Sequence, residues 1–216
     1  MSVIVNFMNR MPAQKFKTYQ VRGEFVCLGT PEQVASFVGS KLVFMFDLDG
    51  TLVRTDKIYK DIWAEMLSKY NIFMDDKFYM QNIHGRNDKD ISNRLGIPVD
   101  TAYKVDEFNK RISSIEILPG VKKFLQLLKL YAHPIAIVTN CERRNAEMIL
   151  KTTDLFQYVD RLTIASECSA QKPSPIPYQT TANFFGVPNT QCVVFEDSRP
   201  GLTSAFGFGP KFRLYF

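Results

Sequence analysis

The sequence lacks any apolar run of about 18 residues, the length that a membrane-spanning helix requires. It also lacks the apolar N-terminal segment of a secretory signal, and it contains no internal repeat or low-complexity stretch. Of its 216 residues, 45% are hydrophobic and 23% are charged, which is typical of a globular chain. These features argue against a membrane, fibrous or disordered protein, and we expect a cytoplasmic location.

Cysteine is scarce, and no two of the four cysteines have the spacing of a zinc motif. Neither a disulfide framework nor a zinc site is expected, and free thiols fit a reducing compartment. The net charge is +5, but no basic run is interleaved with aromatic residues. We therefore expect no nucleic-acid partner. The oligomeric state cannot be predicted from these features.

The distribution of apolar residues divides the chain into three parts. Residues 1–40 form an N-terminal extension with a predicted strand pair and a short helix, to which no function can be attached. Residues 54–118 show apolar residues at helical spacing and no strong strand, so they are predicted to form a helical cap. Residues 41–53 and 119–216 remain as the predicted core.

The predicted core alternates between strands and helices. Residues 41–46, KLVFMF, form an apolar strand without polar alternation, which is typical of a strand covered by helices on both faces. Further short apolar strands are predicted at 135–138, 162–165, 192–195 and 212–216, separated by helical patterns. This alternation predicts an α/β fold, a Rossmann-like parallel sheet with the helical cap inserted after its first strand.

Chemically useful side chains follow four of the predicted strands. In open α/β sheets, ligands bind beyond the carboxyl ends of the strands, so these side chains are expected to converge. Carboxylates hold Mg²⁺, a hydroxyl and an ammonium group can bind phosphate oxygens, and an aspartate can attack phosphorus. The set therefore suits phosphoryl transfer, and its members are Asp47, Asp49, Thr139, Asn140, Lys172, Glu196 and Asp197.

Four segments resemble, in the correct order, the four motifs of the haloacid dehalogenase superfamily. The resemblance covers about residues 41–216 and points to the subgroup with a small helical cap, which contains phosphoglycolate-phosphatase-like and β-phosphoglucomutase-like enzymes. The matching segments are Asp47-Leu48-Asp49-Gly50-Thr51, Val138-Thr139-Asn140, Lys172-Pro173-Ser174-Pro175, and Glu196-Asp197-Ser198 with Gly201.

The resemblance implies a role for each of these residues. Asp47 would be the nucleophile, and Asp49 the acid and base that protonates the leaving group and then activates water. Mg²⁺ would be held by Asp47, the Asp49 carbonyl and Asp197, with Glu196 near the metal. The phosphate-binding residues would be Thr139, Lys172 and, in support, Asn140. The implied activity is Mg²⁺-dependent hydrolysis of a small phosphomonoester through an aspartyl-phosphate.

Three positions depart from the pattern of the family. Ile176 replaces an aspartate that usually follows the third motif, and Arg54 replaces an aspartate after the first. Tyr59 stands where relatives often have a histidine that supports the acid/base in phosphomutases. The tyrosine argues against the nearest alternative, a phosphomutase.

Substrate choice is expected to depend on the cap. Arg86 lies between predicted cap helices and is a candidate for binding a second anionic group or sugar hydroxyls, and Arg54 at the hinge could face the cleft. His84 is more readily interpreted as a partly buried structural histidine than as a catalyst. Two alternatives from other classes remain, a dehalogenase and a non-catalytic binding or assembly module that uses residues 1–40.

Overall fold

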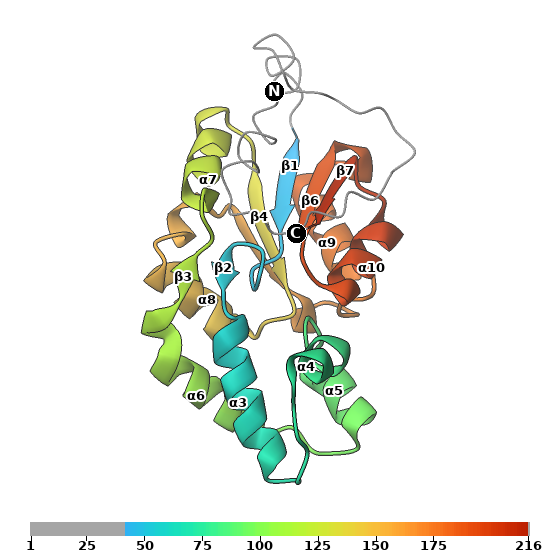
Figure 1. Ribbon diagram of the computed structural model, residues 1–216. Coiled ribbons are helices and arrows are strands. Elements are labelled where there is room, and N and C mark those ends of the chain that lie inside the picture. The colour runs from blue at the N-terminus through green and yellow to red at the C-terminus, as the bar shows by residue number, and fades with distance from the viewer. Residues whose placement is uncertain (1–41, 216) are drawn as a thin grey trace.

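The computed structural model describes residues 42–215, so the predicted N-terminal extension lies outside the described residues. Its central feature is a five-stranded sheet in the order β5-β4-β1-β6-β7, in which every neighbouring pair is parallel (Figure 1). The strands are β1 (Val43–Phe46), β4 (Ile135–Thr139), β5 (Arg161–Ile164), β6 (Cys192–Glu196) and β7 (Phe212–Tyr215). The predicted α/β class with a Rossmann-like parallel sheet is confirmed.

The apolar run in β1 is explained by burial on both faces. Phe44 and Phe46 belong to one hydrophobic cluster, whereas Val43 and Met45 belong to the other. This split follows the alternation of side chains along a strand. One face is covered by α7 (Val121–Leu130) and α8 (Arg143–Thr152), the other by α9 (Ile176–Phe185) and α10 (Arg199–Phe208).

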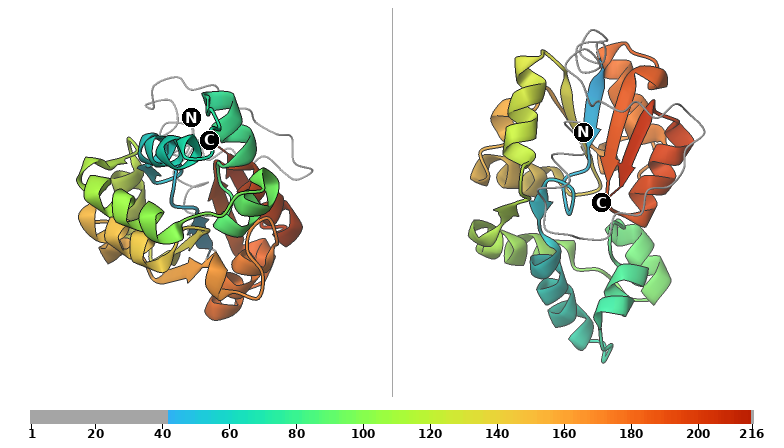
Figure 2. Two further views of the ribbon diagram at one scale, coloured as in Figure 1. Left: turned by 90° about the horizontal axis from the view of Figure 1, so that it is seen from below. Right: turned by 45° about the horizontal axis from the view of Figure 1, so that its top comes forward.

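Four helices lie together beyond the carboxyl edge of the sheet (Figures 1 and 2). Their buried side chains, such as Trp63 and Phe108, join the hydrophobic cluster on the α7 and α8 face of the sheet. The helices are α3 (Asp56–Ser68), α4 (Asp76–Asn82), α5 (Asp88–Leu95) and α6 (Thr101–Arg111). They occupy the segment predicted as a cap; the boundaries at 54 and 118 remain a prediction.

The helical segment is flanked by a small antiparallel pair that the sequence pattern did not reveal. β2 (Val53–Arg54) pairs with β3 (Glu116–Ile117), so the chain leaves and re-enters the core at neighbouring points. Two-residue strands are too short to show an alternating pattern, which is why no strand was expected there.

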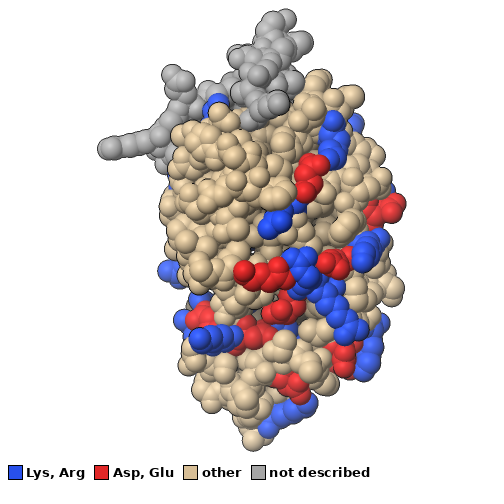
Figure 3. Space-filling model, turned by 180° about the vertical axis from the view of Figure 1, so that it is seen from behind, with Lys and Arg blue, Asp and Glu red and all other residues tan. Residues whose placement is uncertain are grey.

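The surface carries charges of both signs. On the face turned away from the viewer of Figure 1, Lys and Arg side chains alternate with Asp and Glu and do not form one basic patch (Figure 3). Within the described residues, every helix is too short or too polar to span a bilayer.

Candidate active site

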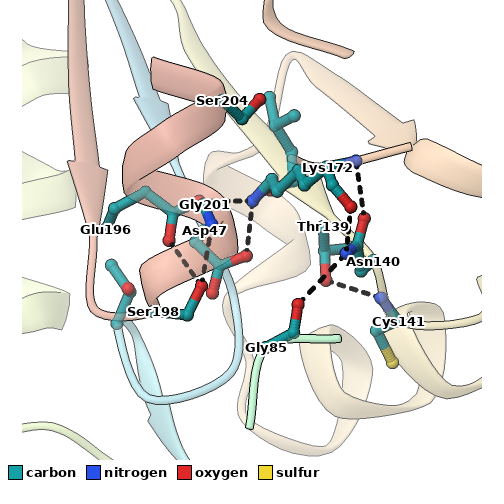
Figure 4. Close-up of polar contacts among 12 residues, drawn as sticks. Asp47, Gly85, Thr139, Asn140, Cys141, Lys172, Glu196, Ser198, Gly201 and Ser204 are labelled. Atoms are coloured by element: carbon teal, nitrogen blue, oxygen red, sulfur yellow. Dashed lines mark hydrogen bonds and ion pairs between the residues drawn. The ribbon is translucent and has the colours of Figure 1, made fainter. Parts of the chain in front are cut away.

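The site begins where three neighbouring strands end. β1 lies between β4 and β6, and Phe46 is in register with Ile137 on one side and Phe195 on the other. Because the three strands are parallel, the residues that follow them reach the same edge of the sheet, which faces α3 to α6. Asp47, Thr139 and Glu196 are brought together in this way (Figure 4).

Lys172 is the centre of the floor of this site. Its side chain is 2% exposed, and its Nζ donates hydrogen bonds to Asp47 Oδ1 at 2.8 Å, Glu196 Oε1 at 2.6 Å and the Val138 carbonyl at 2.6 Å (Figure 4). Burial alone would lower the pKa of Lys172, but the two carboxylates outweigh it and the pKa is raised. Lys172 is therefore a permanent cation whose three protons are all engaged.

Glu196 is held by protein groups on both of its oxygens. Besides Lys172, the Tyr178 hydroxyl donates to Oε1 at 2.6 Å, and Ser198 Oγ donates to Oε2 at 3.3 Å. A Cβ at Gly201 would lie 2.0 Å from this carboxylate, so only glycine permits the close approach of α10. The role of Tyr178 was missed, because a tyrosine on a largely apolar helix gives no signal of a buried carboxylate partner.

The two aspartates after β1 have different surroundings. Asp47 is buried, and burial raises its pKa well above the usual range, with Lys172 opposing and the nearby carboxylates adding to the rise. Asp49 accepts a hydrogen bond from Thr55 Oγ1 at 2.7 Å. Burial raises the pKa of Asp49 to about 6, although Thr55 opposes the shift. A carboxyl group with such a pKa can both give and take a proton near neutrality.

Three carboxylates are arranged so that they could hold a divalent cation. Asp47, Glu196 and Asp197 each offer an oxygen within 4.8 Å of the others. All donors are hard oxygens, which fits Mg²⁺ by chemistry. Glu196 already shares its oxygens with protein donors, whereas among the described residues Asp197 has only longer contacts, with Thr51 Oγ1 at 3.4 Å and His84 Nε2 at 3.4 Å. Asp197 and the Oδ2 of Asp47, whose Oδ1 accepts from Lys172, are thus the most available ligands.

Thr139 and Asn140 occupy the end of β4. Thr139 is 1% exposed, and its Oγ1 accepts a hydrogen bond from the Cys141 N–H at 2.9 Å. The Asn140 amide donates to the Gly85 carbonyl at 3.2 Å and to the Lys172 carbonyl at 3.3 Å, and it accepts from Lys172 N–H at 3.2 Å (Figure 4). Asn140 therefore links the floor of the site to the loop between α4 and α5.

A second contact between that loop and the floor is made by His84. Its Nε2 lies 3.4 Å from both Asp56 Oδ1 and Asp197 Oδ2. Burial would lower the pKa of His84, but these carboxylates raise it to about 10, so the ring is a cation at neutral pH. The sequence suggested a partly buried structural histidine, and the structure shows in addition that His84 faces a candidate metal ligand.

The helices and the sheet edge enclose a cavity of about 100 Å³. Asp47, Asp49, Thr139, Asn140, Lys172 and Asp197 line it from the sheet. Arg86 lines it from the helical side, where Nη1 donates to Asp90 Oδ2 at 2.7 Å. Arg54 is exposed on β2 and is not among the lining residues, so the structure does not bring it to the site.

Tyr59 also lines the cavity, at the position where relatives often have histidine. Its ring stacks on Phe108 with centroids 4.9 Å apart, and its hydroxyl lies 3.6 Å from Cys141 Sγ. Burial raises the pKa of both groups well above their usual values. Cys141 is therefore a neutral thiol at physiological pH, which fits a structural role better than a nucleophilic one.

A parallel α/β sheet with convergent acids, a buried lysine and a helical roof defines the class of a capped phosphoryl-transfer enzyme. The chain belongs to the haloacid dehalogenase-like hydrolases, whose family model matches residues 44–213. This confirms the family expected from the four motifs, and with it the expectation of a phosphoric monoester hydrolase.

Individual relatives are distant. The chain is 28% identical to a validoxylamine A 7'-phosphate phosphatase from Streptomyces hygroscopicus, covering 76% of this chain and 80% of the relative. It is also 28% identical to a phosphorylated carbohydrates phosphatase from Thermotoga maritima, covering 79% and 82%. Among solved structures, CbbY from Rhodobacter sphaeroides in complex with phosphate superposes with a TM-score of 0.70 at 21% identity, covering 80% and 84%. That likeness establishes the fold.

Proposed function

We propose that the chain is a Mg²⁺-dependent phosphatase that hydrolyses a small phosphomonoester through an aspartyl-phosphate on Asp47. One observation carries the proposal: Asp47 lies on the cavity wall at the end of β1, fixed by Lys172 at 2.8 Å. Relatives named as phosphatases of validoxylamine A 7'-phosphate, phosphorylated carbohydrates and fructose-1-phosphate support a phosphorylated small metabolite as the substrate.

In the proposed reaction, an oxygen of Asp47 forms a bond to phosphorus as the bond from phosphorus to the leaving oxygen breaks. Asp49 donates its proton to that leaving oxygen. In the second half, Asp49 takes a proton from water as the water oxygen attacks phosphorus, and the bond to Asp47 breaks to release inorganic phosphate. The pKa of Asp49, about 6, suits this double duty.

The remaining residues bind and orient the phosphoryl group. Lys172 is fixed by three acceptors, so it neutralises the crowded carboxylates and presents positive charge to the phosphoryl oxygens. Thr139 contributes its hydroxyl, and Asn140 fixes the two loops that border the site. Closure of the helical side over the sheet edge would exclude bulk water from the first step.

A divalent cation would be held by Asp47, the Asp49 carbonyl and Asp197, with Glu196 beside it. When bound, it supplies positive charge that offsets the negative charge on the phosphoryl oxygens. The oxygen-only donor set of Asp47, Glu196 and Asp197 supports Mg²⁺ as the physiological ion. The phosphomutase, dehalogenase and binding-module alternatives gain no comparable support from the site.

The proposal is tested by phosphate release from a panel of small phosphomonoesters, with and without Mg²⁺. Asp47→Asn keeps the size of the side chain but removes the nucleophile, and we expect its kcat to fall by at least about 10³-fold. EDTA should abolish release by the wild type, and added Mg²⁺ should restore it. Full activity in a folded Asp47→Asn variant, checked by thermal unfolding, would contradict the proposal.

A further inference from the structure

α8 provides one wall of the cavity, and the polar groups on this wall differ from the rest of the lining in having open hydrogen-bond acceptors. Glu142 stands at the N-cap position of α8 without a capping hydrogen bond, and Asn145 follows three residues later, so the two lie on the same side of the helix. Both line the cavity. Within the described residues, the Glu142 carboxylate has no hydrogen bond or ion pair, and Asn145 Oδ1 has no hydrogen-bond partner although the residue is 1% exposed. The open groups of this wall are therefore acceptors.

The Asn145 side chain lines the cavity together with Tyr59, which is fixed by stacking on Phe108 and by its contact with Cys141. Among the described residues, the buried amide oxygen of Asn145 has no hydrogen-bond partner. A buried acceptor without a partner is costly, so it marks a place where a donor from a bound molecule would be favoured.

The basic side chains that line the cavity, by contrast, are all paired within the described part of the chain. Lys172 contacts Asp47 and Glu196. The remaining pairs are Arg86 with Asp90, Lys104 with Asp88, and His84 with Asp56 and Asp197. A second anionic group on a substrate would therefore meet only cations that already have a carboxylate partner, and it would be repelled by Glu142.

We propose that Glu142 and Asn145 select a leaving group that donates hydrogen bonds and carries no second negative charge. The substrate class is then a monophosphate of a neutral, polyhydroxylated compound such as a sugar or polyol. This inference rests on the proposed phosphatase function and narrows it. It also revises the expectation for Arg86: its Nη1 pairs with Asp90, and its buried Nε–H, which has no partner among the described residues, is left to donate to a neutral hydroxyl.

The charge requirement is tested by comparing two substrates. The ratio of kcat/KM for fructose 1-phosphate to that for 2-phosphoglycolate, whose leaving group glycolate carries a carboxylate, should exceed about tenfold in the wild type. Glu142→Lys should lower this ratio by at least about tenfold, and Glu142→Gln by a smaller factor. Asp106→Lys makes the same change of net charge at an exposed site on α6 outside the cavity, and it should leave the ratio unchanged.

The hydrogen-bond requirement has a matched control in the same protein. Asn145→Leu should lower kcat/KM for fructose 1-phosphate by about tenfold while that for butyl phosphate, which has no hydroxyl, stays within about twofold. Asn109 on α6 also has buried amide atoms without partners, but it does not line the cavity. Asn109→Leu should therefore change neither value. Thermal unfolding of each variant verifies that it is folded.

Several outcomes would overturn the inference. A wild type that prefers 2-phosphoglycolate contradicts it, as does a Glu142→Lys variant with an unchanged ratio or an Asn145→Leu variant that slows both esters equally. If the wild type releases no phosphate from any ester, the proposed function fails, and the same ratios are then taken from dissociation constants by calorimetry. A binding preference that Glu142→Lys removes would still support the inference, and its absence would refute it.

Discussion

The ion pairs at the floor of the site are buried, whereas the ion pair on the outer face of the cap helix α3 is exposed to solvent. At the floor, Lys172 and Glu196 have side chains 2% and 1% exposed, and Lys172 touches two carboxylates and a carbonyl. On α3, Lys57 and Asp61 are 2.8 Å apart, but their side chains are 88% and 50% exposed. The distances are similar, so the difference between the two pairs lies in their burial.

This difference in burial explains why the floor of the site and its roof, the cap helices α3 to α6, can have different functions. If one partner of a buried ion pair is removed, water cannot take its place. The ion pairs at the floor therefore hold its side chains in position before any substrate binds. Exposed pairs are easily exchanged for contacts with water and salt. The residues that perform the reaction common to a family can therefore lie at the floor, while the residues of the roof can differ from one substrate to another.

The largest effect on stability is expected for Lys172→Met. The substitution keeps the length of the side chain but leaves Asp47 and Glu196 buried without their cation. We expect the free energy of unfolding, measured by urea denaturation at pH 7, to fall by about 3–5 kcal/mol. A loss below about 1 kcal/mol would show that the floor is no more sensitive than a surface pair.

The floor was also the part of the protein that the sequence predicted best. Asp47 and Asp49 follow an apolar run, and Glu196 and Asp197 follow another, so the parallel-sheet pattern alone placed them at one edge. The strand pattern also placed Lys172 near this edge, but the loop before it has no periodic signal, so its position among the carboxylates came from the family motif. The ring of contacts around Glu196, with Tyr178 as donor and Gly201 as spacer, depends on how α9 and α10 pack and could not be predicted.

The roof was predicted less well, for a physical reason. Helical periodicity located α3 to α6, but it does not indicate which polar residues turn inward. Arg86 lines the cavity, whereas Arg54 lies on the surface, and no pattern in the sequence points to Glu142 or Asn145. Side-chain direction in loops and at helix ends is set by tertiary contacts, and the sequence carries no local signal for them.

The contact between roof and floor is tested by Gly85→Ala. Gly85 has φ +70°, and a Cβ added there would lie 2.4 Å from Ser198 Cβ, so the loop must move away from the floor. We expect kcat/KM to fall by about 10–100-fold, because closure positions the reacting groups.

Gly96 at the end of α5 is the matched control for this variant. It has φ +66° and nothing within 4 Å of an added Cβ, so Gly96→Ala introduces the same backbone strain without the clash. Its kcat/KM should stay within about twofold of the wild type. If both alanine variants lose activity equally, strain rather than loss of closure is responsible.

A smaller effect is expected from His133, just before β4 and buried against Phe44 with ring centroids 5.1 Å apart. Burial lowers its pKa below the ordinary value of 6.5, although a backbone hydrogen bond with Leu42 opposes the shift. The unfolded chain therefore binds this proton more readily. The contribution of neutral His133 is complete above pH 6.5 and is lost as the pH falls toward the lowered pKa.

His133→Leu should remove that part of the pH dependence. Between pH 7.5 and 5.5, the wild type should lose up to about 1 kcal/mol more unfolding free energy than the variant, as measured by urea denaturation at each pH. A difference of the opposite sign would mean that the folded protein favours the protonated ring.

The smallest effect is expected for the exposed pair on α3. Lys57→Ala removes the contact with Asp61 but leaves both positions in water, where solvent and salt replace the lost interaction. The free energy of unfolding should change by less than about 0.5 kcal/mol, and less still at 0.5 M NaCl. This change in unfolding free energy is to be compared with the loss in Lys172→Met, since both variants remove one lysine that lies 2.8 Å from an aspartate oxygen. If the two losses were similar, burial could not be what separates the floor from the roof.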